Sequence, residues 1–168
     1  MARELHDRRA AAETPILGRA AELEALDALV ATGARTITLR GPAGVGKSRL
    51  ALEWSIGRAG AIGGVLECDV EGLGSAAALV RELAARLDVP LATGNDEAHE
   101  RRVLSSLSVR GRLTLVVDGA EALDERARAV LGRALASAPD VRIVASSRRA
   151  LGLEGERVLD VEPLAPPD

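Results

Sequence analysis

The 168-residue sequence predicts an α/β fold: a mainly parallel, five-stranded sheet with helices on both faces, arranged as a three-layer sandwich. Two observations support this prediction. Short apolar runs alternate along the chain with longer segments in which leucine, valine and alanine recur every three or four residues. The apolar runs are continuous, which is typical of strands buried on both faces of a parallel sheet. Such sheets bind ligands at the carboxyl ends of their strands, so a site is expected there.

The first half of the chain contains two predicted helices and two predicted strands. Leucines at positions 23, 26 and 29 form an apolar stripe that predicts a helix over residues 20–32. The stretch "RTITLRG" predicts a strand that ends at a glycine turn, and residues 47–58 then favour a helix. "GGVLECDV" predicts the second strand, in which Cys68 is interpreted as a small buried apolar residue.

In the second half, capping residues mark where helices begin. Ser75 is a predicted cap for the helix in "GSAAALVRELAARLDVP", and a weaker helix is expected from Asn95 to Leu107. Asp124 is predicted to cap a helix whose apolar side consists of Ala127, Val130, Leu131, Ala134 and Leu135. The remaining strands are predicted in "RLTLVVDG", "DVRIVASS" and "ERVLDVEPL".

The terminal residues are interpreted separately from the domain. Residues 1–14 are polar and charged without periodicity, which predicts a flexible arm. Residues 15–164 are expected to form one domain, and residues 165–168 lie beyond its last predicted strand. No apolar run reaches the length of a membrane span, and the first residues lack an apolar signal core. A cytoplasmic location without membrane contact is therefore expected.

Composition argues against direct nucleic-acid binding by this domain. The net charge is −3, with a sequence pI near 5.5, whereas phosphate backbones require clustered positive charge. Aromatic residues make up 1% of the chain, which leaves almost no surface on which bases could stack. The arginine doublets are short and scattered, and they are interpreted as solvated surface charge.

The most informative motif surrounds Lys47, the only lysine among 22 basic residues. "GPAGVGKS" fits the pattern GxxxxGK(S/T) and lies between a predicted strand and a predicted helix, the context that a phosphate-binding loop requires. The motif predicts that residues 15–164 form a P-loop nucleotide-binding domain, with the fold of the P-loop NTPases. The predicted nucleotide-binding residues here are Gly41, Pro42, Ala43, Gly44, Val45, Gly46, Lys47, Ser48 and Arg49.

Each residue type in this loop has a chemical reason. Glycines accept the backbone angles that turn successive N–H groups toward an anion, and the start of the following helix adds partial positive charge. Lys47 is a compact cation that can reach the β- and γ-phosphates, whereas a planar guanidinium would not fit the same slot. Ser48 is a predicted Mg²⁺ ligand through its hydroxyl group.

A second predicted magnesium residue is Asp118, which ends the apolar run "LTLVVD". An aspartate in this position is commonly a turn former when it stands alone. Here it follows the phosphate loop by about seventy residues, and we interpret it as holding Mg²⁺ through water and as a catalytic residue together with Lys47.

Together these stretches resemble the nucleotide-binding domain of the STAND signal-transduction ATPases, relatives of the NB-ARC class in bacterial regulators. "ILGRAAELEAL" resembles the family's opening motif, which implies that Leu17, Gly18 and Arg19 lie near the adenine and ribose of ATP or ADP. "RIVASSRRALGLEGERVLDVEPL" resembles its sensor segment, which implies that Arg148 reaches the γ-phosphate. Without this resemblance, Arg148 would be read as a surface charge.

One departure from the family pattern bears on catalysis. Gly119 follows Asp118, at a position where related ATPases carry a residue that positions the attacking water. Glu121 is a candidate replacement, although a helix-start or surface role is an equal interpretation. A general base contributes about 10²- to 10⁴-fold to a rate, so its loss predicts slow hydrolysis.

The resemblance implies an ATP/ADP-dependent switch in a parent protein with C-terminal winged-helix and sensor domains, and residues 165–168 are then expected to begin the linker to these modules. It also implies ATP-dependent self-association of that parent. Two alternatives remain open at this point. One is a degenerate ADP-binding interaction module without hydrolysis, which Gly119 favours slightly. The other is a small-molecule phosphotransferase, which would need an acceptor pocket and an arginine-rich lid; only Arg101 and Arg102 suggest one.

Overall fold

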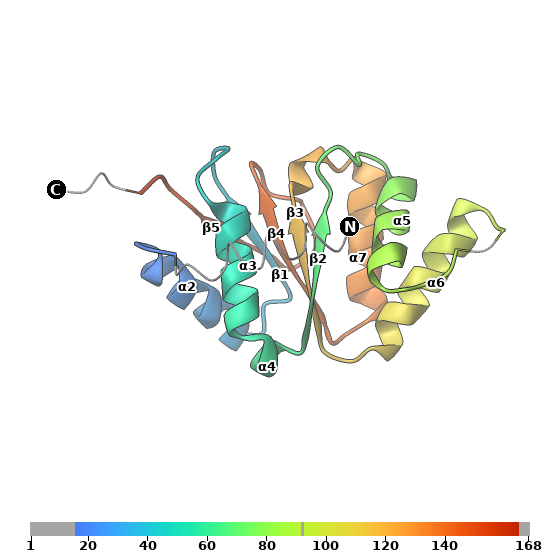
Figure 1. Cartoon of the computed structure of the whole chain (residues 1–168), viewed down its shortest axis with the longest axis horizontal. Helices are drawn as coiled ribbons and strands as arrows, with labels where there is room; N and C mark the ends of the chain where they lie inside the picture. The colour runs from blue at the N-terminus through green and yellow to red at the C-terminus, as the bar shows by residue number, and fades with distance from the viewer. Residues whose placement is uncertain (1–15, 92, 165–168) are drawn as a thin grey trace.

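A computed structural model describes residues 16–91 and 93–164 of the chain (Figure 1). The predicted arm at residues 1–14 and the predicted linker at residues 165–168 lie outside the described residues. No helix within the described part of the chain is long and apolar enough to cross a membrane.

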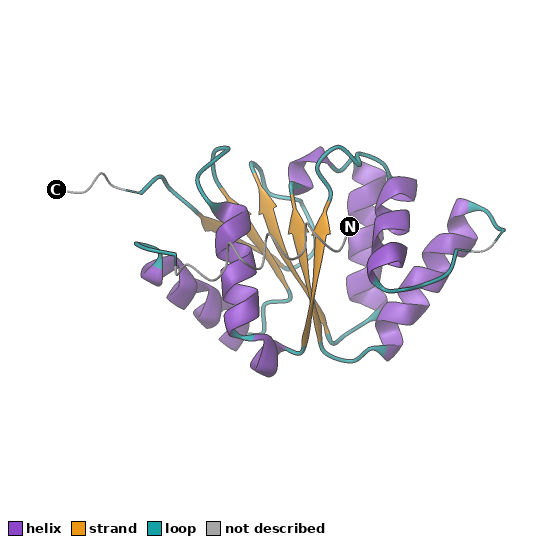
Figure 2. Cartoon of the chain, in the orientation of Figure 1, coloured by secondary structure: helices purple, strands orange, loops and turns teal. Residues whose placement is uncertain are grey.

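All five strands run parallel, which confirms the predicted sheet (Figure 2). Their spatial order is β2 (Gly64–Asp69), β3 (Leu113–Asp118), β4 (Val141–Ser147), β1 (Thr36–Arg40) and β5 (Glu156–Asp160). β1 therefore lies between β4 and β5, with Arg40 paired to Ser147 on one side and Asp160 on the other. The carboxyl ends of these strands meet at one edge of the sheet.

Helices cover both faces of the sheet, as predicted. One layer contains α2 (Ala20–Ala31), α3 (Lys47–Gly57) and the short α4 (Ala59–Ile62). The other contains α5 (Ala76–Arg86), α6 (Asp96–Val109) and α7 (Glu125–Ser137), and a single 3-10 turn, η1 (Ala120–Ala122), follows β3. The predicted caps are present: the side chains of Ser75 and Asp124 accept hydrogen bonds from the N–H groups of Ala78 (3.3 Å) and Ala127 (2.7 Å).

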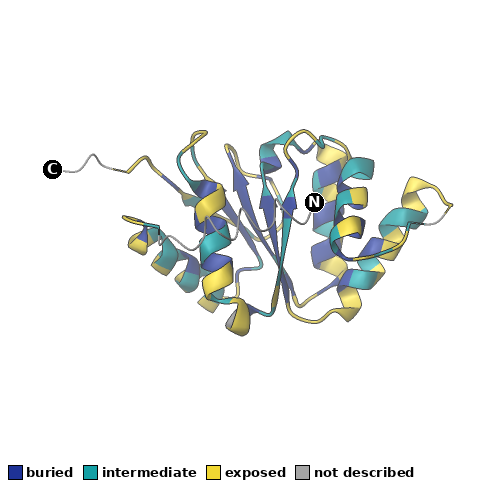
Figure 3. Ribbon diagram, in the orientation of Figure 1, coloured by how far each residue is buried: buried dark blue, intermediate teal, exposed yellow. Residues whose placement is uncertain are grey.

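Two apolar cores lie on the two faces of the sheet (Figure 3). The core under α5, α6 and α7 contains the five predicted apolar residues of α7, together with Cys68. Burial raises the pKa of the Cys68 thiol to about 12. The core under α2 and α3 contains Trp54, the only aromatic residue of the chain; its Nε1 donates to Asp27 Oδ1 at 2.9 Å.

The structure differs from the prediction in the bounds of some elements. The short helix α4 was not expected, α6 continues to Val109 instead of ending at Leu107, and β5 ends at Asp160. Between β4 and β5, where no helix was predicted, residues 148–155 contain none. The carboxylate of Glu156 organises this connection: it accepts hydrogen bonds from the N–H groups of Leu151 and Gly152 (both 2.8 Å) and from Thr38 Oγ1 (2.6 Å).

Candidate functional site

The loop between β1 and α3 begins where both neighbouring strands hold it. The Gly41 N–H donates to the Ser147 carbonyl at 3.2 Å, and the Val161 N–H donates to the Arg40 carbonyl at 2.7 Å. A Cβ atom on Gly41 would lie 2.3 Å from the Val161 carbonyl oxygen, which is closer than real atoms approach. This contact explains why the first residue of the motif is glycine.

The second half of the loop has the backbone form of an anion-binding nest. Gly44 (φ +76°) and Gly46 (φ +98°) are in the left-handed region, and Gly46 is the N-cap residue of α3. Pro42 and Ala43 are exposed beside them, and Arg49 is exposed in the first turn of α3. The loop therefore combines left-handed glycines with the free N–H groups of a helix start.

Lys47 folds back over this loop. Its Nζ donates to the carbonyl oxygens of Gly41 (2.9 Å) and Pro42 (2.8 Å), and the residue is 8% exposed. Both acceptors are neutral, so these hydrogen bonds position the ammonium group without cancelling its charge. A cation held in this way is suited to an incoming anion.

Asp118 lies at the carboxyl end of β3 and connects two further elements. Its Oδ1 accepts hydrogen bonds from the hydroxyl groups of Ser48, at the start of α3, and Ser146, near the end of β4. The Gly119 N–H in turn donates to Ser146 Oγ at 3.1 Å. The structure thus brings the two predicted magnesium residues together, as binding of one cation by both would require.

Sequence reasoning did not identify Ser146, which is 2% exposed and holds the Asp118 carboxylate from the neighbouring strand. A signal was present: two serines end an otherwise apolar strand in "RIVASS". Which of the two serines faces Asp118 depends on the register between β3 and β4, which the sequence does not reveal.

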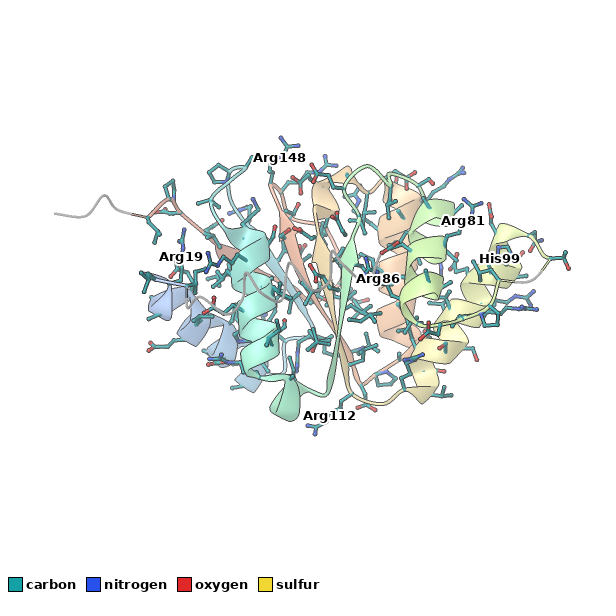
Figure 4. All side chains as sticks on the ribbon, viewed as in Figure 1. Arg19, Arg81, Arg86, His99, Arg112 and Arg148 are labelled. Carbon is teal, nitrogen blue, oxygen red and sulfur yellow. The ribbon has the colours of Figure 1, made fainter. Side chains whose placement is uncertain are left out.

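Arg148 and Glu121, which were predicted as separate site residues, form an ion pair with Arg148 Nε 2.9 Å from Glu121 Oε1. Arg149 adds a hydrogen bond from Nη2 to the Glu121 carbonyl at 3.3 Å. The Arg148 side chain is 64% exposed at the edge of the sheet where the strands end (Figure 4). The pair lies beside Asp118, because Glu121 belongs to the turn that follows it.

Arg19 is the N-cap residue of α2 and is 3% exposed. Its Nη1 donates to Glu22 Oε1 (2.5 Å) and to the Glu162 carbonyl (2.8 Å), while Nη2 donates to the Val45 carbonyl (2.8 Å). Figure 4 shows Arg19 beside α2 and α3. The guanidinium is therefore committed to the backbone around the phosphate loop, whereas Leu17 is 81% exposed beside it.

These residues fit a nucleotide phosphate with a magnesium ion. The left-handed glycines and the start of α3 supply backbone donors, Lys47 supplies a cation, and Ser48 and Asp118 supply oxygen ligands of the kind Mg²⁺ prefers. The fit rests on the donor set of this chain and on its arrangement at the carboxyl edge of a parallel sheet.

A comparison with protein families supports the same reading. The model of the AAA domain matches residues 30–147, which is more than half of the chain and includes the phosphate loop, Asp118 and Ser146. The chain belongs to the AAA domain family. It is an AAA-type P-loop ATPase domain with the nucleotide-binding loop of that class.

Relatives of this AAA domain are longer proteins. Uncharacterized proteins of Mycobacterium bovis and Mycobacterium tuberculosis are each 31% identical to it over 160 residues. The match covers 90% of this chain but 38% of each relative, so the chain spans well under half the length of the curated relatives it matches.

Solved structures share the fold at low sequence identity. Cdc6p from Pyrobaculum aerophilum has a TM-score of 0.72 and 18% identity over 89% of this chain and 46% of that chain. A chain of Drosophila ORC bound to AT-rich DNA and Cdc6 has a TM-score of 0.62 and 16% identity over 96% of this chain and 58% of that chain. PCH-2 of C. elegans has a TM-score of 0.52 and 17% identity over 85% of this chain and 42% of that chain.

The contact at Gly41 gives a first prediction. Gly41→Ala should lower the free energy of unfolding by about 1–3 kcal/mol, because its Cβ would push the Val161 backbone away from the loop. Gly57→Ala is the matched control: it lies in α3 with open space around it, so its stability should stay the same or rise by up to about 1 kcal/mol. Urea unfolding followed by Trp54 fluorescence measures both, and equal stabilities would contradict the prediction.

Proposed function

We propose that this AAA domain is the ATP/ADP-binding switch of a STAND-type signal-transduction regulator, with slow magnesium-dependent ATP hydrolysis. The observation that carries the proposal is the joint placement of Lys47 on the loop carbonyls and of Ser48 on Asp118. These contacts position a cation and two oxygen ligands at one loop, as binding of a nucleoside triphosphate and Mg²⁺ requires.

In the proposed complex, each residue has a distinct task. The N–H groups of the loop and Lys47 would bind phosphate oxygens, and Ser48 and Asp118 would hold Mg²⁺, which would neutralise phosphate charge. Ser48 releases its hydrogen bond to Asp118 and turns its hydroxyl oxygen toward the metal site. Ser146 keeps its own hydrogen bond to Asp118, so this carboxylate stays oriented when Ser48 leaves.

The pairing of Arg148 with Glu121 supports a switch with slow turnover. Glu121 Oε1 is occupied by Arg148 Nε, and Gly119 offers no side chain that could position an attacking water in its place. Arg148 can reach a γ-phosphate only by leaving Glu121, so ATP and Glu121 would compete for the same cation. Because ADP has no γ-phosphate, this competition distinguishes ATP from ADP. It can bias the segment that carries Arg148 between two arrangements.

The nucleotide base is proposed to be adenine, held near Leu17, Gly18 and the segment after β5. Leu17 and Leu164 are exposed apolar residues, at 81% and 53%, and a Cβ atom on Gly18 would lie 3.1 Å from Leu164 Cδ2. Exposed apolar side chains next to a phosphate loop suit the flat face of a base.

The greater length of the mycobacterial relatives supports a parent protein with further modules, proposed here as winged-helix and sensor domains. ATP-dependent self-association of that parent and a cytoplasmic location are part of the same proposal. Drosophila ORC is a complex described with DNA, but the net charge of −3 favours nucleic-acid contact, where present, by other modules.

The role of Lys47 gives the primary test. The wild-type chain is expected to bind Mg-ATP and ADP in the micromolar range in a calorimetric titration, after removal of co-purified nucleotide. Lys47→Ala should weaken binding by about 100-fold, because a charge-assisted contact to phosphate is lost. Lys47→Arg should not restore nucleotide binding, since a planar guanidinium group does not fit the space that the Lys47 ammonium group occupies. Arg133→Ala, which breaks an ion pair between α7 and α6, is the control; unchanged binding in Lys47→Ala would refute the site assignment.

A second experiment addresses Arg148. Arg148→Ala should weaken ATP binding by about 10-fold and ADP binding much less, because only ATP offers a γ-phosphate. Arg149→Ala is the matched neighbour, since its guanidinium contacts the Glu121 carbonyl at 3.3 Å. Equal losses for the two nucleotides in Arg148→Ala would remove its proposed sensor role.

Single-turnover hydrolysis separates the switch from an ADP-binding module without catalysis, which Gly119 also suits. We expect phosphate release within minutes, dependent on Mg²⁺ and abolished in Asp118→Asn. Absence of phosphate release over hours, with binding intact, would favour the module.

A further inference from the structure

The phosphate loop touches the segment that leaves the domain after β5, residues 161–164, here called the exit segment. The Val161 N–H donates to the Arg40 carbonyl at 2.7 Å, and the Val161 carbonyl lies against Gly41, where a Cβ atom would be 2.3 Å away. Leu164, at the far end of the same segment, lies near Gly18, where a Cβ atom would be 3.1 Å from Leu164 Cδ2. The loop and the exit segment therefore share one interface with the start of α2.

Arg19 is the residue that fastens this interface. One arm of its guanidinium, Nη1, donates to the Glu162 carbonyl in the exit segment, and the other, Nη2, donates to the Val45 carbonyl in the phosphate loop; both distances are 2.8 Å. The guanidinium is planar and rigid, so the two carbonyl oxygens are held at a fixed separation. The backbone of Arg19 is also fixed, because Arg19 is the N-cap residue of α2 and its carbonyl accepts the Leu23 N–H at 3.0 Å.

Burial makes these hydrogen bonds costly to break. Arg19 is 3% exposed, and its charge is paired with Glu22 at 2.5 Å. Moving either carbonyl away would leave a buried guanidinium donor unsatisfied. A shift of Val45 on nucleotide binding would therefore be transmitted to Glu162. In the same way, a shift of the exit segment would be transmitted to the phosphate loop.

We propose that Arg19 is a positioning residue of the nucleotide site, which links Val45 in the phosphate loop to Glu162 in the exit segment. Occupancy of the loop and order in the exit segment then depend on each other. This inference rests on the proposed function. It adds the route by which nucleotide binding would affect the chain that follows residue 164. By thermodynamic linkage, the factor by which nucleotide favours the ordered exit segment equals the factor by which order in that segment strengthens nucleotide binding. Anything that pulls the exit segment away therefore weakens nucleotide binding.

The test compares hydrogen exchange of the exit segment with and without saturating Mg-ADP. In the wild type, ADP should slow exchange of the amides at residues 161, 162 and 164 at least several-fold. In Arg19→Lys, the cation is kept but an ammonium cannot span both carbonyls, so ADP affinity should fall about 10-fold and the protection at these amides should disappear.

Glu22→Gln is the matched control, since it removes the ion-pair partner of Arg19 and keeps both carbonyl contacts. It should leave ADP affinity and the protection as in the wild type, although the melting temperature falls. A purely structural Arg19 would lower the melting temperature in both variants without uncoupling the exit segment. Equal ADP-induced protection in Arg19→Lys and wild type overturns the inference, as does the absence of protection in a wild type that binds ADP. A wild type that binds no ADP overturns the proposed function and the inference with it.

Discussion

The position of β1 between β4 and β5 is the constraint on which the rest of the site depends. Both edges of β1 are occupied, so the first residue beyond it is held from two sides: the Gly41 N–H by the Ser147 carbonyl and the Arg40 carbonyl by the Val161 N–H. The loop is thus anchored before it turns. From this fixed point, the left-handed Gly44 and Gly46 can direct the chain into α3, and Ser48 arrives beside Asp118 of β3. A loop on an edge strand would lack one of these anchors.

The same arrangement explains why polar side chains gather at the carboxyl ends of β3 and β4, whose interiors are mainly apolar. Most interior side chains of these strands contribute to the two cores, and the polar ones are Thr114 in β3 and Arg142 in β4. At the carboxyl ends, Asp118 and Ser146 form hydrogen bonds across the sheet and with α3. The parallel register stacks these ends at one level, so polar residues from three separate segments meet without any of them leaving its own element.

Periodicity and capping chemistry predicted most of the fold because both are local. The apolar side of α7, the caps Ser75 and Asp124, and the glycine loop ahead of α3 depend on residues a few positions apart. The contacts that sequence reasoning missed join distant segments: Ser146 with Asp118, and Arg148 with Glu121. The connection between β4 and β5 also depends on a distant contact, because Glu156, which accepts the Leu151 and Gly152 N–H groups, is itself bonded to Thr38 in β1.

The choice between lysine and arginine shows how shape decides these roles. Lys47 lies 8% exposed over a tight loop, where one compact ammonium group reaches two adjacent carbonyl oxygens, those of Gly41 and Pro42. Arg19 spans two carbonyl oxygens from separate segments, a task for a planar group with several fixed donors. Both cations donate to backbone carbonyl oxygens close to the same loop, but Arg19 is also paired with the Glu22 carboxylate, whereas the acceptors of Lys47 are both neutral. In a chain that otherwise uses arginine for every basic residue, the single lysine therefore stands where a point charge, and not a fork, matches the backbone around it.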